Sequence, residues 1–535
     1  MSIYSSTLLH QTFEHTARRV PQRCALVCQE GRYSYAQVAR DVGRLATFLQ
    51  HRGVQRGDRV ALFLDNSPEV VTAIYATLAV GAVFMPINPL TKPEKLAHMI
   101  KETQPGVLVS HTHLREVFEP VLAVGSSVHT CIVTGDAPGV GIPWEMALAH
   151  PGQVVEPTTI DQDLAAILYT SGSTGEPKGI MLSHRNMLTA QASVCSYLGL
   201  EEDDIILCAL PLTFDYGLYQ ILMGFMQGAC VVLERTFVFP VKILELMARE
   251  KVTVFPGVPT MFTLMLNLDL HPYDLGHLRI ITNTAAALSE HQIHDIRRLF
   301  PQARLFSMYG LSECKRVSYL PPEQLDVRPL SVGRGMPNEE VYLIDEDGNR
   351  LPNGHTGELV IRGSHVMRGY WGKPEETAKC LKPGPYPGEQ VLLSGDIFHT
   401  DEEGYLYFVG RKDDIIKSRG EKVSPREVEN AIDSLEGVLE SAVIGVPDPV
   451  LGQAVTAFVV QKEGYRYTEK DIVRHCLTRL ENFMVPKQVV FVSTLPKTNT
   501  GKISKNGLYQ ALVKYLALEL CFELAYVFSV APAIT

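Results

Sequence analysis

The stretch that decides the fold and the chemistry is Tyr169-Thr-Ser-Gly-Ser-Thr-Gly-Glu-Pro-Lys-Gly179. It sets hydroxyls, glycines and one lysine between two apolar runs, 164–168 and 180–182. Glycine lets backbone N–H groups turn toward an anion, the hydroxyls add donors, and the lysine adds a mobile positive charge. The loop therefore favours a triphosphate, with candidate contacts from Thr170, Ser171, Gly172, Ser173, Thr174, Gly175 and Lys178.

The loop does not have the spacing of a Walker A motif. Gly-x-x-x-x-Gly-Lys-Ser/Thr does not fit between Gly172 and Gly179, which disfavours a kinase or a P-loop ATPase. Runs of Ser, Thr and Gly also occur in solvated linkers. Pro177-Lys178-Gly179 sets this run apart from an ordinary linker.

Further motifs follow the loop in a fixed order. They are Tyr309-Gly-Leu-Ser-Glu313, Ser394-Gly-Asp396, Gly410-Arg-Lys-Asp-Asp414 and Pro496-Lys-Thr-Asn-Thr-Gly-Lys502. Over residues 10 to 507 the set resembles the adenylate-forming superfamily: acyl-CoA synthetases, adenylation domains of nonribosomal peptide synthetases and firefly-type luciferases. The resemblance implies an enzyme that joins a carboxylic acid to AMP, using ATP and Mg²⁺, and then passes the acyl group to a thiol.

Composition fits a soluble enzyme with more than one domain. The chain has 535 residues, 46% hydrophobic and 20% charged, which is an ordinary globular balance but too long for one core. The net charge of −10, without a dense basic run, argues against binding nucleic acid. Ten scattered cysteines and an amino terminus without a secretory signal predict a cytoplasmic enzyme. Glu519 and Glu523 interrupt the apolar C-terminal stretch, so no membrane span is expected.

The pattern of apolar residues predicts an α/β fold. Short β-branched runs alternate with helical stretches, as in parallel strands joined by crossover helices. We expect a large N-terminal domain of parallel and mixed sheets with helices at residues 1–410, which binds nucleotide and substrate. A charged segment near Gly410 predicts a hinge, followed by a small mobile α+β domain at 411–507. The apolar tail, 508–535, has no assigned role.

The resemblance also implies roles in nucleotide binding. Glu313 matches the acid that holds Mg²⁺, and Ser312 keeps a phosphate-binding hydroxyl where threonine is more usual. Tyr309 and Phe408 match aromatic residues that sandwich adenine, although packing in the core is the alternative for each. The remaining matches are Asp396 for the ribose hydroxyls, Arg411 for ribose and phosphate, and Thr284, Ala285 and Ala286 in place of a glycine-rich adenine-edge loop.

The C-terminal motifs carry the implied catalytic residues. Lys502 matches the lysine that bridges the acid's carboxylate and the α-phosphate; outside such a motif a lysine is usually a solvated side chain. Asp413 matches the hinge about which the small domain turns between two steps. Lys417 lies on the segment that would enter the site for thioester formation, and Lys505 stands where arginine is frequent.

The substrate is indicated by Leu210-Pro-Leu-Thr-Phe-Asp-Tyr-Gly217. Its Phe-Asp pair resembles that of amino-acid-activating domains, in which the aspartate, here Asp215, pairs with the α-ammonium of the substrate. The alternative is that Asp215 caps a helix. Tyr219 and Met308 are further candidates for this pocket. The run 309–319 resembles freestanding ligases that load L-proline onto a carrier protein.

The sequence leaves two candidates for the thiol that accepts the acyl group. Only 33 residues follow Lys502, too few for a carrier domain, so the acceptor is a carrier protein in trans or coenzyme A. The alternative activity is therefore an AMP-forming fatty-acyl or aryl-CoA ligase. A luciferase-type oxidase and a silent binding protein are disfavoured, because nothing marks oxygen chemistry and both Lys502 and Glu313 are present.

Overall fold

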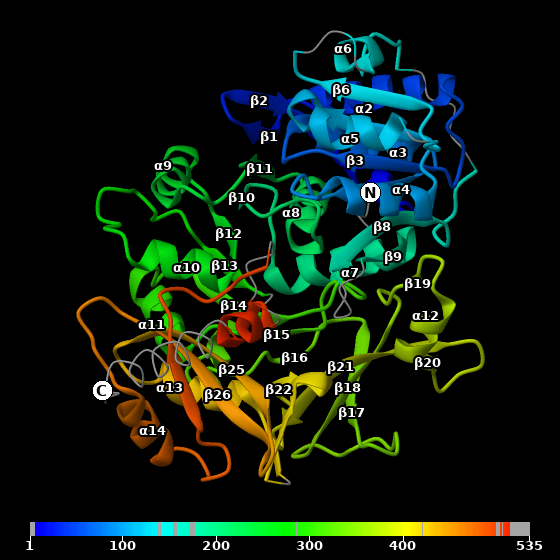
Figure 1. The fold of residues 1–535 in the computed structure, drawn as a ribbon. Helices are drawn as coiled ribbons and strands as arrows, with labels where there is room; N and C mark the ends of the chain where they lie inside the picture. Colours follow the sequence, from blue (N-terminus) through cyan, green and yellow to red (C-terminus); the bar gives the residue numbers. More distant parts are fainter. Residues whose placement is uncertain are drawn as a thin grey trace, which may run out of the picture.

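The computed structural model describes residues 6–123, 125–136, 139, 141–152, 158–171, 177–284, 286–419, 421–498, 503–505 and 507–513. Within these ranges the strands form four sheets. In Figure 1 most of the first sheet is blue to cyan and lies at the top, the second runs from the dark blue of residues 24–34 to green, the third is yellow-green to yellow, and the fourth is yellow to orange-red.

The first sheet carries the phosphate-loop hairpin. Its order is β19-β9-β8-β4-β3-β5-β6-β7, and the register of β4, β3, β5 and β6 is parallel. Buried aliphatic strands of this kind need helices on their faces. The strands are β3 (Arg59–Phe63), β4 (Val83–Ile87), β5 (Val107–His111), β6 (Thr130–Thr134), β7 (Ile142–Pro143), β8 (Leu164–Ser171), β9 (Pro177–Ser183) and β19 (Gly369–Tyr370). The helices among them are α3 (Pro68–Ala79), α4 (Pro93–Thr103), η2 (Thr112–Leu114), α5 (Arg115–Ala123) and α6 (Trp144–Ala147).

The second sheet has the order β16-β15-β14-β13-β12-β10-β11-β1-β2. Its strands are β1 (Cys24–Cys28), β2 (Gly31–Ser34), β10 (Ile205–Cys208), β11 (Cys230–Leu233), β12 (Val254–Gly257), β13 (Ile280–Asn283), β14 (Arg304–Tyr309), β15 (Ser318–Leu320) and β16 (Arg334–Gly335). The other helices of this part of the chain, of which α7 contacts β8 and β9 of the first sheet, are α1 (Leu9–Arg19), α2 (Tyr35–His51), α7 (His184–Leu198), α8 (Asp215–Gln227), α9 (Pro240–Glu250), α10 (Pro259–Leu266), α11 (Glu290–Leu299) and η3 (Pro322–Gln324). Because β10, β12, β13 and β14 are parallel, their carboxyl ends share one edge, where ligands of α/β sheets bind.

The remaining strands form one antiparallel sheet and one mixed sheet. The third contains β17 (Glu339–Ile344), β18 (Thr356–Gly363), β20 (Leu381–Pro383), β21 (Gln390–Thr400) and β22 (Leu406–Arg411), with α12 (Pro374–Cys380). The fourth contains β23 (Ile416–Ser418), β24 (Glu421–Val423), β25 (Val438–Asp448), β26 (Gly452–Gln461) and β27 (Gln488–Phe491), preceded by η4 (Lys412–Asp414) and packed with α13 (Pro425–Asp433) and α14 (Glu469–Leu477). In the fourth sheet β26 and β27 are parallel, whereas the other pairs are antiparallel.

These sheets confirm the predicted fold class: a large N-terminal part of parallel and mixed sheets with helices, and a small α+β C-terminal domain. The exact boundaries at residues 410 and 507 stay a prediction. At the junction, the Ser424 hydroxyl donates a hydrogen bond to the carbonyl of Val409, and Lys412 forms an ion pair with Glu358. Among the described residues, no helix is both long and apolar enough to cross a bilayer.

Candidate active site

The two ends of the predicted phosphate loop, residues 170–178, belong to a β-hairpin. Strands β8 and β9 pair in antiparallel register up to Thr170 opposite Lys178 and Ser171 opposite Pro177. The hairpin is tied to α4, because the Tyr169 hydroxyl donates to Glu102 Oε2 at 2.7 Å. The predicted contacts Gly172, Ser173, Thr174 and Gly175 lie outside the described residues, in the connection between the two strands. The structure therefore fixes the two ends of the loop.

Lys178 is held beside this loop by an acidic partner. Its Nζ lies 2.8 Å from Glu376 Oε2 on α12, and 5.3 Å from the centre of the Tyr370 ring. The other oxygen of Glu376 accepts from Lys379 at 2.5 Å. The Lys178 and Lys379 ammonium groups lower the pKa of Glu376 to about 2. Lys178 thus has a counter-ion within the protein itself.

Glu313 lies in the same group of side chains. The Tyr370 hydroxyl donates to Glu313 Oε1 at 2.8 Å. Burial, with Glu313 nearby, raises the pKa of this phenol well above its usual range, so Tyr370 stays a hydrogen-bond donor. The glycine of the motif has a steric reason, since a Cβ on Gly310 would lie 2.3 Å from the carbonyl oxygen of Lys315. Glycine at position 310 therefore lets the chain at Lys315 pass close by, and this close approach shapes the turn on which Glu313 lies.

The residues present fit Mg²⁺ bound with a nucleotide. In the described part of the chain no three His, Cys, Asp or Glu residues cluster as a metal site. Mg²⁺ commonly uses one or two carboxylates together with substrate phosphates, so Glu313 alone suits it. When bound, the ion supplies positive charge that offsets repulsion between phosphates and a carboxylate.

Tyr309, Asp396 and Arg411 form the predicted nucleotide-binding trio. Asp396 is 3% exposed; its Oδ2 accepts from the Tyr309 hydroxyl at 2.6 Å and its Oδ1 lies 3.2 Å from Arg411 Nε. The register of β21 and β22 sets Asp396 opposite Arg411, and β14 ends at Tyr309. Burial, followed by Asp396, raises the pKa of Tyr309 well above its usual range.

The neighbouring aromatic rings form a cluster. Tyr309 and Phe408 lie 6.4 Å apart between ring centres, and Phe398 contacts both at 4.8 and 5.4 Å. At the adjacent end of β13, Thr284 is buried, and Asn283 donates to the carbonyl of Ala286 at 2.9 Å. Asn283 Oδ1 is buried with no hydrogen-bond partner among the described atoms, which fits a ligand that donates there, such as an adenine amino group. Ala285 lies outside the described residues.

Asp215 lies beside a buried lysine. It is the first residue of α8 and follows Phe214, which is the N-cap residue and makes no side-chain capping hydrogen bond. Lys315 Nζ lies 3.6 Å from Asp215 Oδ2, donates to the Asp215 carbonyl at 3.1 Å, and is 4.5 Å from the centre of the Tyr219 ring. Burial lowers the pKa of Lys315 to about 7, an effect that Asp215 opposes. The carboxylate predicted to meet a substrate amine therefore already has a cation beside it.

The other residues predicted to line the acid pocket are tightly packed. A Cβ on Gly217 would lie 2.3 Å from the carbonyl oxygen of Pro211, so glycine permits the close turn before α8. Met308 is buried, and its sulfur accepts from the Tyr197 hydroxyl at 3.0 Å. Arg316 is 2% exposed with its guanidinium 5.2 Å from the centre of the Tyr216 ring, and no anion pairs with it in the described residues. Tyr219 thus packs beside Lys315 near Asp215, and Met308 is a buried residue of β14.

The described site residues of the C-terminal part do not form one cluster. Asp413 is exposed in η4, and its neighbour Asp414 pairs with Lys505 at 3.0 Å. Lys417 is an exposed residue of β23, and its backbone N–H donates to Gln453 at 2.7 Å. In this conformation Lys417 makes no described contact with the Lys178 or Asp396 groups. Lys502 lies outside the described residues.

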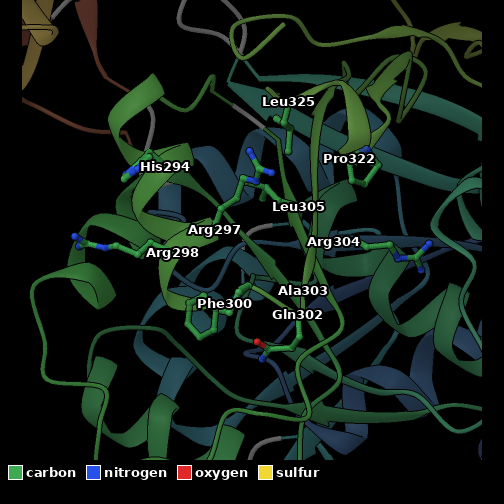
Figure 2. A pocket seen from close by; sticks show the side chains of 11 residues that line it. His294, Arg297, Arg298, Phe300, Gln302, Ala303, Arg304, Leu305, Pro322 and Leu325 are labelled. Carbon is green, nitrogen blue, oxygen red and sulfur yellow. The ribbon is translucent and has the colours of Figure 1, made fainter. Parts of the chain in front are cut away.

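A separate hollow of about 440 Å³ lies beside α11 and β14. Figure 2 shows its lining, which includes His294, Arg297, Arg298 and Arg304. Arg297 pairs with Asp326, and Arg298 lies 3.2 Å from Asp295. None of the predicted site residues lines this hollow, and two of its cations already have partners.

The sequence did not indicate Tyr370, Glu376 or Lys315 as site residues. Tyr370 and Glu376 lie between the motifs that end at Glu313 and begin at Ser394, and no spacing pattern marks them, since they reach Glu313 and Lys178 through the pairing of β19 with β9. Lys315 had a weak signal: a Cys-Lys-Arg run directly after Glu313 in an otherwise apolar stretch.

The comparisons agree with this arrangement. Residues 13–371 match the AMP-binding enzyme family and residues 427–502 match the AMP-binding enzyme C-terminal domain. The chain belongs to the AMP-binding enzyme family. This confirms the resemblance to adenylate-forming enzymes, and as a member the protein is an adenylate-forming acid–thiol ligase that uses ATP and Mg²⁺.

Several relatives of this AMP-binding enzyme cover nearly its whole length. It is 31% identical to a long-chain-fatty-acid–CoA ligase of Bacillus subtilis, over 94% of each chain. It is 34% identical to a feruloyl-CoA synthase of Amycolatopsis, over 91% of this chain and 96% of that one. The structure of ATP-bound MatB from Rhodopseudomonas palustris superposes with a TM-score of 0.85 at 31% identity, covering 94% of this chain and 98% of that one.

Proposed function

We propose that this ligase activates an amino acid, with L-proline as the first candidate, and transfers it to the phosphopantetheine thiol of a separate carrier protein. The observation that carries the amino-acid assignment is Asp215 at the start of α8, with 20% of its side chain exposed. A partly exposed carboxylate can accept a second cation on its free oxygen. The resemblance of residues 309–319 to L-proline ligases supports the choice of amino acid.

The reaction is assigned to the two groups of side chains described above. Lys178 and the loop after Thr170 would hold the β- and γ-phosphates, and Asp396 with Arg411 would hold the ribose. Lys502 would stabilise charge that grows between the acid's carboxylate and the α-phosphate. Lys417 would serve the second step after rotation near Asp413. We place the enzyme in the cytosol, which fits the free thiols of the described cysteines.

A second candidate is an AMP-forming fatty-acyl or aryl-CoA ligase. The contact between Lys315 and Asp215 favours it, because a carboxylate that is already paired gains less from a substrate amine. Two of the similar proteins named above are a long-chain-fatty-acid–CoA ligase and a feruloyl-CoA synthase.

Two assays separate these candidates. Acid-dependent ATP–pyrophosphate exchange is measured with proline, the other amino acids, hexanoate and benzoate. Proline is expected to give the highest kcat/KM. Thioester formation is then compared between a panel of phosphopantetheinylated carrier proteins and coenzyme A. A preference for hexanoate or benzoate, with rapid coenzyme A thioester formation, would establish the second candidate instead.

A further inference from the structure

Lys178, the cation of the phosphate loop, has one described anionic partner, and it lies on an element outside the loop. The pair joins Lys178 Nζ to Glu376 Oε2 at 2.8 Å. Both side chains are largely withdrawn from solvent, with 15% of Lys178 and 31% of Glu376 exposed. For Lys178 to bind phosphate oxygens, this ion pair must break, or the ammonium must divide its N–H donors between Glu376 and the phosphate.

The position of Glu376 is set by the backbone rather than by chance contact of long side chains. Strand β19 pairs with β9, with Tyr370 opposite Ile180, and the Trp371 N–H donates to the carbonyl of Gly179 at 2.7 Å. The Tyr370 N–H in turn donates to Thr377 Oγ1 on α12 at 2.9 Å. These bonds fix α12 against the strand that carries Lys178.

Glu376 also has a second cationic partner, Lys379. Its second oxygen accepts from Lys379 at 2.5 Å, one helical turn away on the same helix. When Lys178 leaves, the carboxylate therefore keeps a cation and is not left unpaired. The cost of releasing Lys178 is small for that reason.

We propose that Glu376 is a positioning residue that pairs with Lys178 and competes with the β- and γ-phosphates of ATP for its ammonium group. The inference rests on the proposed role of Lys178 in phosphate binding. It adds that Glu376 weakens the binding of ATP and pyrophosphate by competing for one ammonium group, which favours release of pyrophosphate after adenylation.

The test measures binding without an acid substrate, so it does not depend on which acid the enzyme activates. Isothermal titration with ATP, pyrophosphate and AMP, each with Mg²⁺, compares wild type with Glu376→Gln. The dissociation constants of ATP and pyrophosphate should fall about three- to fivefold, the range for a partly exposed ion pair. That of AMP, which lacks the β- and γ-phosphates, should not change.

Two controls separate competition from general electrostatics and from misfolding. Glu375→Gln removes the same charge from the exposed neighbouring residue, which has no described ion pair with Lys178, and should leave ATP affinity within twofold of wild type. In a Lys178→Met background, Glu376→Gln should have no further effect on ATP affinity, because the double-mutant cycle isolates the coupling. Unchanged or weaker ATP binding by Glu376→Gln, or an equal gain in the Lys178→Met background, would overturn the proposal. Inactivity toward every amino acid would instead count against the proposed function and leave these binding results standing.

Discussion

Lys315 Nζ lies 3.6 Å from Asp215 Oδ2, and the two residues are 100 positions apart in the chain. Lys315 is 2% exposed at its side chain, whereas Asp215 is 20% exposed. The carboxylate is therefore the member of the pair that a substrate can reach. How strongly Asp215 binds a substrate amine depends on how strongly its carboxylate attracts a second cation while it is paired with Lys315.

The Asp215–Lys315 pair predicts a linked effect on stability. Asp215→Ala leaves the buried Lys315 without its anion, so the pKa of this lysine, already lowered to about 7 by burial, should fall further and the free energy of unfolding should decrease by about 1–3 kcal/mol. The double variant Asp215→Ala, Lys315→Met removes both charges and should recover most of that loss. Urea denaturation measures both. Equal stability of Asp215→Ala and wild type would show that the contact is energetically neutral.

The same variant should also separate amino acids from other acids. If Asp215 accepts a substrate ammonium, Asp215→Ala should lower kcat/KM for proline activation by about 100-fold, or about 3 kcal/mol. The des-amino analogue, cyclopentanecarboxylate, should lose much less. Equal losses for the two acids would mean that Asp215 acts through packing.

The small domain should show a pH-dependent stability that depends on Asp433. Burial, partly offset by Arg426, raises the pKa of Asp433 from 3.8 to about 7, so the folded protein binds this proton more tightly than the unfolded chain. The contribution is then most favourable below about pH 4 and is lost as pH rises toward 7. Asp433→Asn should therefore stabilise the protein relative to wild type more at pH 8 than at pH 5, as measured by chemical denaturation. Glu436→Gln, at an exposed neighbouring position, is the control; a pH-independent difference for Asp433→Asn would contradict the assignment.

The hinge should separate the two half-reactions. Asp413→Pro fixes φ near −65° and removes a backbone donor in η4, which should hinder rotation of the small domain more than it disturbs the acid pocket. Pyrophosphate exchange should persist, while loading of a carrier protein falls by at least tenfold. Lys417→Ala should behave in the same way. If both half-reactions fall equally in both variants, domain rotation about Asp413 is not the reason.

The sequence best predicts those parts of the fold and of the candidate site whose contacts join residues that are close together in the chain. The predicted phosphate loop connects two paired strands, and Asp396 lies opposite Arg411 in the β21–β22 hairpin, because the residues that set these contacts are close together in the sequence. Partners set by long-range packing could not be predicted in this way. Glu376 reaches Lys178 across 198 positions through a two-residue strand, and Lys315 reaches Asp215 from a turn with a positive φ of 69°.

Lys502 provides the sharpest chemical prediction. Because it would act on charge that develops only in the transition state, Lys502→Ala should slow adenylation by about 100-fold or more with little change in ATP affinity. Thioester transfer from a supplied acyl-adenylate should survive. Lys505→Ala, which removes a lysine paired with Asp414 instead, is the matched control and should keep more than half of the adenylation rate. Near-normal adenylation by Lys502→Ala would remove this residue from the mechanism.

The most direct measurement of the central claim is ATP–pyrophosphate exchange by the wild-type enzyme with proline and with hexanoate or benzoate as competing acids. The account predicts exchange that depends on proline, with kcat/KM at least tenfold above either competitor. Exchange that is absent with every amino acid and strong with hexanoate or benzoate would contradict it.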